Sequence, residues 1–209
     1  MLTLEGKFAR LVPLDLGHAA ALLAAANEDR SSYAFTMIPR DAIEMRMYIH
    51  LAQAEAAKGT AMAFATVDAQ TNRLVGSTRF MGIERWHAYF GPAPTKESAP
   101  TALEIGGTWL AQSAQRTAIN TEAKLLMLRH AFELWKVERV TLKTDARNLR
   151  SRSAIKRLGA TEDGVLRAWQ LASDGGPRDT AVSSILKSEW PEVRARLEEA
   201  LSRPSAARP

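Results

Sequence analysis

The run A-Q-R-T-A-I-N-T-E-A-K, residues 114–124, separates two stretches of different periodicity. Before it, apolar and glycine positions alternate with other residues over 103–109, the period of two expected of a strand with one buried face. After it, apolar residues follow the 3-4-3 spacing of a helix that packs on a core, at Leu125, Leu128, Phe132 and Trp135. The run therefore predicts the turn of a strand-turn-helix crossover.

Such a turn can bind an anion. The first amides of a helix have no acceptor within the helix, and the helix dipole adds partial positive charge there. Residues 115–120 would point backbone N–H groups at a pyrophosphate, and Arg116 would supply a mobile positive charge. Taken alone, however, the turn favours a simpler interpretation, in which Thr117 or Asn120 merely caps a core helix.

Length and composition predict an ordinary globular protein. The chain has 209 residues, of which 46% are hydrophobic and 24% charged, so we expect a single domain over residues 1–201 and a tail at 202–209. No apolar stretch reaches the roughly 20 residues that span a bilayer, and no basic leader precedes the short apolar run at 19–26. With no cysteine, the chain has neither disulfides nor thiolate metal sites. We therefore expect a cytoplasmic protein.

The formal charge of +5 is unevenly distributed. Residues 136–157 contain eight basic and two acidic side chains, a local charge of +6. A solvated basic face, a nucleic acid or a nucleotide-bearing cofactor would each account for such a segment.

The other elements alternate along the chain. Strands are predicted at 8–12, 62–67, 74–82, 137–144, 165–171 and 180–186, and helices at 15–27, 41–58, 149–158 and 192–201. A proline- and aromatic-rich loop is predicted at 84–100. This order favours an α/β (α+β) domain with a mostly antiparallel sheet and a parallel crossover in its middle.

A second strand-to-helix junction is D-A-R-N-L-R-S-R-S-A-I-K-R-L-G-A, residues 145–160. Asn148 and Ser151 stand three residues apart there, where their side chains can cap the helix or hydrogen-bond a ligand. Read alone, this junction also favours a cap. The two junctions together carry more information than either.

Four stretches together resemble the GCN5-related N-acetyltransferases (GNAT), in particular the ribosomal-protein N-terminal acetyltransferase (RimJ/RimL-like) branch. They are E-I-G-G-T-W-L before the turn, Q-R-T-A-I-N-T-E-A-K at it, T-D-A-R-N-L-R-S-R-S-A-I-K-R-L-G-A after it, and G-V-L-R with R-D-T near the end. The resemblance extends over about residues 4–190. It implies a sheet of about seven strands with a splayed parallel pair and helices on both faces. It also implies direct transfer of an acetyl group from acetyl-CoA to an amine.

The resemblance assigns the cofactor contacts. The family's turn pattern falls on Gln115, Arg116, Thr117, Ala118, Ile119 and Asn120, with Ala118 and Asn120 at positions where glycine is usual. Asn148 and Ser151 match residues beside the pantetheine arm and the thiol. Trp109 and Leu110 end the preceding strand and complete the candidate set, although the apolar pattern favours a core position for Trp109.

The resemblance also assigns the catalytic roles. Glu104 occupies the position of the base that takes the amine proton, and Ser151 that of the acid which protonates the leaving thiolate. A backbone N–H of the central strand stabilises the oxyanion in this family. Each role has a rival interpretation, since Glu104 fits a solvated strand carboxylate and Ser151 fits a structural hydroxyl. Because no tyrosine follows Tyr89, Ser151 or solvent must supply the acid.

The aromatic stretch 86–90 of the predicted loop is the candidate for one wall of the acceptor site, and the candidate acceptor contacts are Trp86, His87, Tyr89 and Glu104. The four histidines lack metal-ligand spacing, so no metal is expected.

The preferred acceptor is a protein or peptide N-terminal α-amine. One alternative is a small-molecule amine, such as an antibiotic or a polyamine, and another is a protein that binds acetyl-CoA without catalysis. A homodimer is a candidate assembly, and nucleic-acid binding is disfavoured because the basic segment lacks interleaved aromatics.

Overall fold

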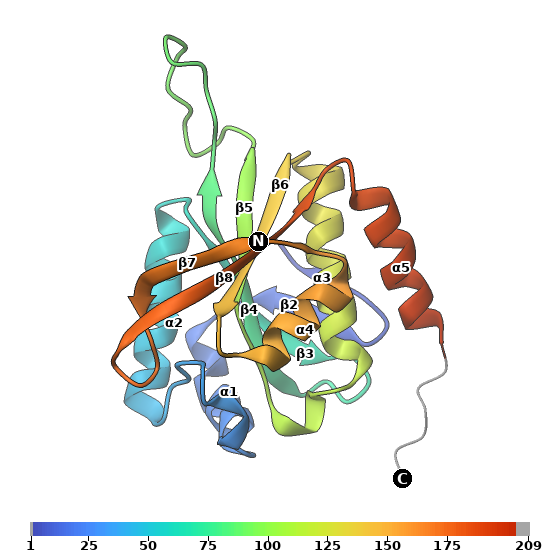
Figure 1. Ribbon diagram of the computed structural model, residues 1–209. Coiled ribbons are helices and arrows are strands. Elements are labelled where there is room, and N and C mark those ends of the chain that lie inside the picture. Colours follow the sequence, from blue (N-terminus) through green and yellow to red (C-terminus); the bar gives the residue numbers. More distant parts are fainter. Residues whose placement is uncertain (1, 204–209) are drawn as a thin grey trace.

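One sheet, in the strand order β1-β2-β3-β4-β5-β6-β8-β7, runs through the computed structural model, which describes residues 2–203 (Figure 1). Neighbouring strands are antiparallel except β5 and β6, which are parallel. The strands are β1 (Leu4–Glu5), β2 (Ala9–Pro13), β3 (Met62–Asp68), β4 (Leu74–Glu84), β5 (Ala102–Leu110), β6 (Arg139–Asp145), β7 (Thr161–Leu171) and β8 (Pro177–Leu186). The expected mostly antiparallel sheet with one central parallel pair is confirmed.

The sheet has eight strands rather than about seven. The additional strand, β1, has only two residues, too few for an alternating pattern to be recognised. β7 and β8 begin earlier than predicted. The two strands pair with each other from Thr161↔Ser184 to Leu171↔Pro177, so backbone pairing extends them beyond the apolar residues from which they were predicted.

Helices cover both faces of the sheet (Figure 1). α1 and α2 pack on β3 and β4, while α3 packs on β1 and β2 and contacts α5, which also contacts α4. The helices are α1 (Ala19–Ala26), α2 (Ala42–Ala57), α3 (Ala118–Arg129), α4 (Leu149–Leu158) and α5 (Trp190–Ser202). Of the tail expected at 202–209, Ser202 instead ends α5, and residues 204–209 lie outside the described residues.

Capping residues set where several helices begin. Asp41 caps α2 as predicted, accepting hydrogen bonds from the N–H groups of Ile43 and Glu44. Asp15 caps a single 3-10 turn, Leu16–His18, so the helix predicted at 15–27 is α-helical only from Ala19. Further 3-10 turns span Ser31–Tyr33 and Gln112–Ala114, and α3 continues as a π-helical turn at His130–Leu134.

A buried carboxylate fixes α3 against the sheet. Glu122 is 7% exposed and accepts hydrogen bonds from the backbone N–H groups of Lys7, Phe8 and Ala9 at the start of β2. A carboxylate that accepts several N–H groups is well satisfied in an apolar interior. The helix that begins at the candidate turn is therefore held in place from its second turn.

A β-bulge interrupts the β4/β5 pairing. Ser77 pairs with Trp109 and Arg79 with Gly106, so Thr78 faces both Gly107 and Thr108. Gly107 has φ +56°, a conformation that side chains other than glycine rarely adopt. The bulge lies in the half of β5 that lines the candidate site.

Candidate active site

The parallel strands β5 and β6 separate part-way along their length. Their pairing runs from Ala102↔Arg139 to Glu104↔Thr141, yet β5 continues to Leu110 and β6 to Asp145. A cavity of about 1000 Å³ opens between the unpaired halves. The edge of β5 at residues 105–110 therefore presents backbone groups that a bound ligand can pair with in place of β6.

The turn before α3 forms one wall of this cavity, lined by Gln115, Arg116, Thr117 and Asn120. Thr117 caps α3 by accepting a hydrogen bond from the N–H of Ile119 at 3.3 Å, and its hydroxyl donates to the carbonyl of Ala114 at 2.7 Å. Arg116 has φ +60°, which turns the chain sharply into the helix. Capping and ligand binding are thus compatible here, since the cap leaves the other N-terminal amides next to the cavity.

Gln115 joins this turn to the end of β5. Its side-chain amide donates to the carbonyl of Leu110 and to the hydroxyl of Ser32, both at 2.9 Å. Arg150 of α4 donates to Oε1 of Gln115 at 3.3 Å and to the carbonyl of Ser32 at 2.6 Å. These hydrogen bonds connect the C-terminal end of β5 with the N-terminal end of α4 at the mouth of the cavity.

The start of α4 forms the opposite wall. Asn148 caps α4 by accepting a hydrogen bond from the N–H of Ser151 at 3.0 Å, and both residues line the cavity. The hydroxyl of Ser151 makes no hydrogen bond to any other part of residues 2–203. It can therefore donate to a ligand without breaking a bond within the protein.

Glu104 lies where the two strands part. Its side chain is 16% exposed and pairs with Lys143 of β6 at 3.0 Å. The Lys143 ammonium in turn lies 5.6 Å from the ring centroid of Trp169. A Cβ atom on Gly106 would lie 2.8 Å from Oε1 of Glu104, so this glycine leaves the space that the carboxylate occupies.

The structure brings together most of the residues assigned from the sequence. The cavity is lined by Glu104, Trp109, Leu110, Gln115, Arg116, Thr117, Asn120, Asn148 and Ser151. Ala118 and Ile119 are not among its lining residues, and Ile119 is buried at 6% exposure. Trp109 is 4% exposed, so it contributes both to the core and to the cavity wall.

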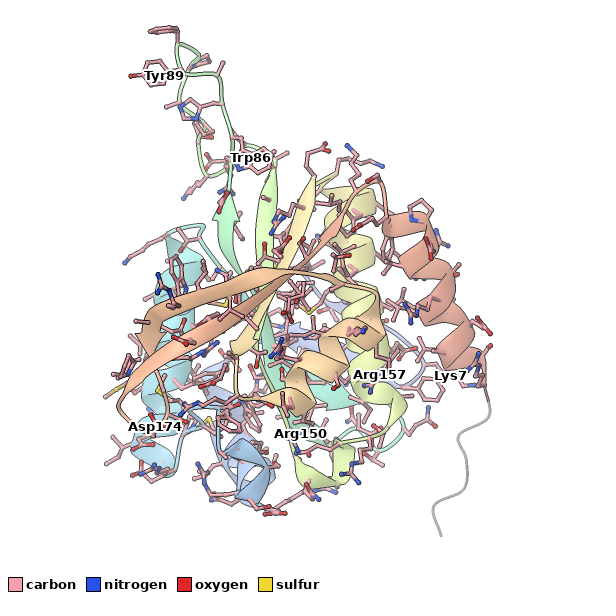
Figure 2. The ribbon with its side chains drawn as sticks, viewed as in Figure 1. Lys7, Trp86, Tyr89, Arg150, Arg157 and Asp174 are labelled. Atoms are coloured by element: carbon pink, nitrogen blue, oxygen red, sulfur yellow. The ribbon has the colours of Figure 1, made fainter. Side chains whose placement is uncertain are left out.

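The aromatic loop extends away from the body of the protein (Figure 1). Trp86 lies at its base, where it lines a second cavity of about 220 Å³ together with Glu104 and Lys143. Tyr89 lies near the tip, as Figure 2 shows, and the residue is 91% exposed. Neither His87 nor Tyr89 lines either of these two cavities. Of the loop residues assigned to the acceptor wall, only Trp86 therefore lies near Glu104.

Six basic residues of the cavity wall were not assigned to the site: Lys143, Arg150 and Arg157 were counted only in the basic segment, and Arg79, Lys124 and Arg178 were not singled out. Lys124 ends the run quoted at the outset, and its place in the helix pattern gave no sign of a role in the site. It is only 4% exposed, and its amine donates to the hydroxyls of Thr78 and Thr108 at 2.8 and 2.6 Å. Burial lowers the pKa of the Lys124 amine to about 7.

Replacing Lys124 with methionine is expected to change how stability depends on pH. In the unfolded chain the pKa of this amine returns to its ordinary 10.5, so between pH 7 and 10 the unfolded chain binds more protons than the folded protein. The free energy of unfolding should then rise with pH across that window in the wild type. Lys124→Met removes the buried charge, and we expect it to be more stable than the wild type at pH 6 by on the order of a few kcal/mol, with the advantage shrinking toward pH 9.

Urea unfolding of the ligand-free protein at pH 6, 7.5 and 9 measures this difference. Thr78 and Thr108 keep a partner in the variant, since their hydroxyls lie 2.8 Å apart. Lys58→Met, at an exposed lysine that follows α2, is the matched control. A pH-independent difference for Lys124→Met would mean that the buried amine does not titrate in this range.

The fold and the cavity together define a class of protein. A splayed parallel strand pair with a free strand edge, a helix N-terminus at its mouth and basic side chains around both fits a long, phosphate-bearing ligand. The profile of the acetyltransferase (GNAT) domain family matches residues 9–161. The chain belongs to this family, whose members transfer an acetyl group from acetyl-CoA, and it is an acyltransferase.

Solved structures support the same classification. A protein of T. thermophilus, provisionally described as an acetyltransferase, is 34% identical, with 96% of this chain and 97% of that chain covered and a TM-score of 0.77. A GCN5-related N-acetyltransferase from Brucella melitensis is 25% identical, with coverages of 99% and 90% and a TM-score of 0.82. RimJ of Mycobacterium smegmatis, solved with CoA-disulfide, shares the fold at 21% identity, coverages of 92% and 88% and a TM-score of 0.74. No curated protein sequence matches the chain significantly.

Neither a membrane-crossing helix nor a metal cluster occurs in residues 2–203. No helix in this part of the chain is both long and apolar enough to cross a membrane. Nor do three or more histidine, aspartate or glutamate side chains within it come together as a metal site would require.

Proposed function

We propose that the protein acetylates a primary amine, and that the N-terminal α-amine of a protein or peptide is the acceptor class it fits best. Similar folds occur in a ribosomal-protein-S5-alanine acetyltransferase from Vibrio fischeri (15% identity, TM-score 0.69) and in the ribosomal L7/L12 α-N-protein acetyltransferase RimL (18%, TM-score 0.73). The observation that carries the proposal is the position of Glu104, a carboxylate on the wall of the cavity at the point where β5 and β6 separate.

Glu104 would act as the general base. An amine is protonated near neutral pH and cannot attack a thioester until it loses a proton. Glu104 takes this proton, directly or through a water molecule, and Lys143 at 3.0 Å holds the carboxylate in position. The freed nitrogen then attacks the thioester carbon.

The unpaired half of β5 and the start of α4 would complete the reaction. Acetyl-CoA supplies the activated acetyl group, and a backbone N–H in the bulged part of β5 stabilises the oxyanion. As the C–N bond forms and the C–S bond breaks, Ser151 donates its hydroxyl proton to the sulfur. Coenzyme A leaves as the thiol, the attacking nitrogen releases its second proton to solvent and becomes the amide nitrogen, and Ser151 regains a proton from solvent.

Calorimetric titration with acetyl-CoA, followed by thiol-release assays, tests this function. We expect micromolar binding of acetyl-CoA and release of coenzyme A with N-terminal peptides. Micromolar binding without thiol release from any peptide, antibiotic or polyamine would identify an inert acetyl-CoA-binding protein. Turnover of antibiotics or polyamines alone would assign a small-molecule acceptor. A random DNA duplex that binds at physiological salt in place of acetyl-CoA would refute the proposal.

A further inference from the structure

The cavity wall carries more positive charge than the cosubstrate accounts for. Among residues 2–203, one acidic side chain lines it, Glu104, whereas seven basic ones do: Arg79, Arg116, Lys124, Lys143, Arg150, Arg157 and Arg178. Three of the seven belong to the α3 turn and to α4, where phosphates would lie, and the other four come from β4, α3, β6 and β8. The positive charge therefore extends beyond the expected phosphate site.

Most of these four side chains already have partners in the protein. Arg79 pairs with Glu55 at 3.3 Å and is 11% exposed, and Lys143 pairs with Glu104 at 3.0 Å. Lys124 is hydrogen-bonded to two hydroxyl groups. The buried Nε of Arg79 lacks a hydrogen-bond partner, as that of Arg178 does, but the charge of Arg79 is paired with Glu55.

Arg178 differs from the other three. It makes no ion pair or hydrogen bond with any of residues 2–203, and its Nε is buried without a partner. Burial lowers the pKa of Arg178, and the charges of Asp145 and Glu104 only partly offset this effect. Asp145 is already engaged by Arg147, whose guanidinium donates two hydrogen bonds to it at 3.0 and 2.8 Å. A part-buried guanidinium without a partner is costly, and a bound anion would remove that cost.

Strand register places Arg178 on the same face of the sheet as the candidate base. Lys143 pairs with Val182 on β8, and side chains alternate along a strand, so Arg178 projects to the same side as Lys143. Glu104 projects to this side too, because it pairs with Thr141, two residues from Lys143. Apolar side chains line the cavity as well: Phe35, Met37 and Leu171.

We propose that the acceptor carries a carboxylate near its amine, and that Arg178 binds this carboxylate while the amine lies at Glu104. The inference rests on the proposed acetyltransferase function and specifies its substrate class. Two kinds of acceptor share this chemistry, a free amino acid and a peptide with an acidic residue close to its N-terminus. Polyamines and aminoglycosides do not fit, because Arg178 and Lys143 would repel their additional ammonium groups.

Acetylated products are suitable probes, because their binding does not require turnover. Three would be titrated into the protein saturated with coenzyme A: N-acetylalanine, N-acetyl-alanyl-aspartic acid α-amide, whose side-chain carboxylate is free, and neutral N-acetylalaninamide. We expect at least one of the two carboxylate probes to bind about tenfold or more tightly than the neutral amide, the usual value of one charge-assisted pair. The stronger of the two identifies the source of the carboxylate.

The variant Arg178→Gln should abolish this preference, while the binding of coenzyme A stays unchanged. Arg196→Gln, at an exposed arginine on α5, is the matched control and should keep the preference. Equal binding of the carboxylate and amide probes, no measurable binding of any probe, or a preference that survives Arg178→Gln would each overturn the inference. Failure of the proposed function would appear separately, as absence of thiol release in the turnover assay.

Discussion

Acetyl-CoA binding is expected to fall by at least about 100-fold when Ala118 is replaced by glutamate. Ala118 is the first residue of α3 and follows Thr117, which lines the cavity. A glutamate side chain at this position can reach the N-terminal amides and would compete there with a phosphate. It would also repel the pyrophosphate of coenzyme A across a short distance.

The same substitution should leave the fold intact, which makes the result interpretable. A carboxylate in the first turn of a helix interacts favourably with the helix dipole, by about 0.3–1 kcal/mol. Thr117 already occupies the cap position and is unchanged. Thermal unfolding of Ala118→Glu should therefore match or slightly exceed the wild type, while calorimetric titration shows the loss of binding.

Ala118→Gln separates the effect of charge from that of size. Glutamine has the same shape without the charge, so this variant should bind acetyl-CoA more weakly than wild type but much better than Ala118→Glu. If Ala118→Glu bound acetyl-CoA with wild-type affinity, the pyrophosphate could not lie at this turn. If both variants lost binding equally, steric exclusion rather than charge would explain the result.

Glu104→Gln is expected to lower kcat by about 100-fold or more, the usual contribution of a general base. An amide cannot take up the amine proton, although it can still accept a hydrogen bond from Lys143. The loss should appear in kcat at saturating acceptor, while the Kd for acetyl-CoA changes little, because Glu104 lies outside the expected phosphate site. Steady-state thiol release and calorimetry measure the two quantities.

Glu192→Gln is the control for this prediction. It makes the same chemical change at an exposed position in the first turn of α5, so kcat should remain at the wild-type value. Unchanged turnover of Glu104→Gln at saturating acceptor would remove Glu104 as the base. Its pairing with Lys143 would then be structural, and a lower unfolding temperature alone would be the expected consequence.

Local sequence signals predicted the two strand-to-helix junctions that line the cavity. The turn at 114–117 and the capped start of α4 follow from short-range chemistry, because Thr117 and Asn148 hydrogen-bond backbone groups two and three residues away. Glu104 was identified from its place in an alternating strand that resembles a known family. Interactions of this range are encoded in consecutive residues and can be read without knowing the fold.

Contacts between distant strands were not visible in the sequence. Lys143 was counted only as one charge of a basic segment, yet it pairs with Glu104 because the β5/β6 register places Glu104 opposite Thr141. The predicted acceptor loop shows the same limit, since its composition marked it as special without revealing that Tyr89 extends away from the cavity.

The sequence by itself determined the order of strands and helices, the two strand-to-helix junctions and the family. Alternation, helical spacing and capping depend on neighbours a few residues apart, and these neighbours are fixed by the chain. Only the tertiary structure decided that Lys124 is buried among hydroxyl groups and that Arg178 lies without a partner among residues 2–203 on the cavity wall. Burial and charge pairing depend on residues brought together from distant parts of the chain, so they are set by strand register and by helix packing on the sheet.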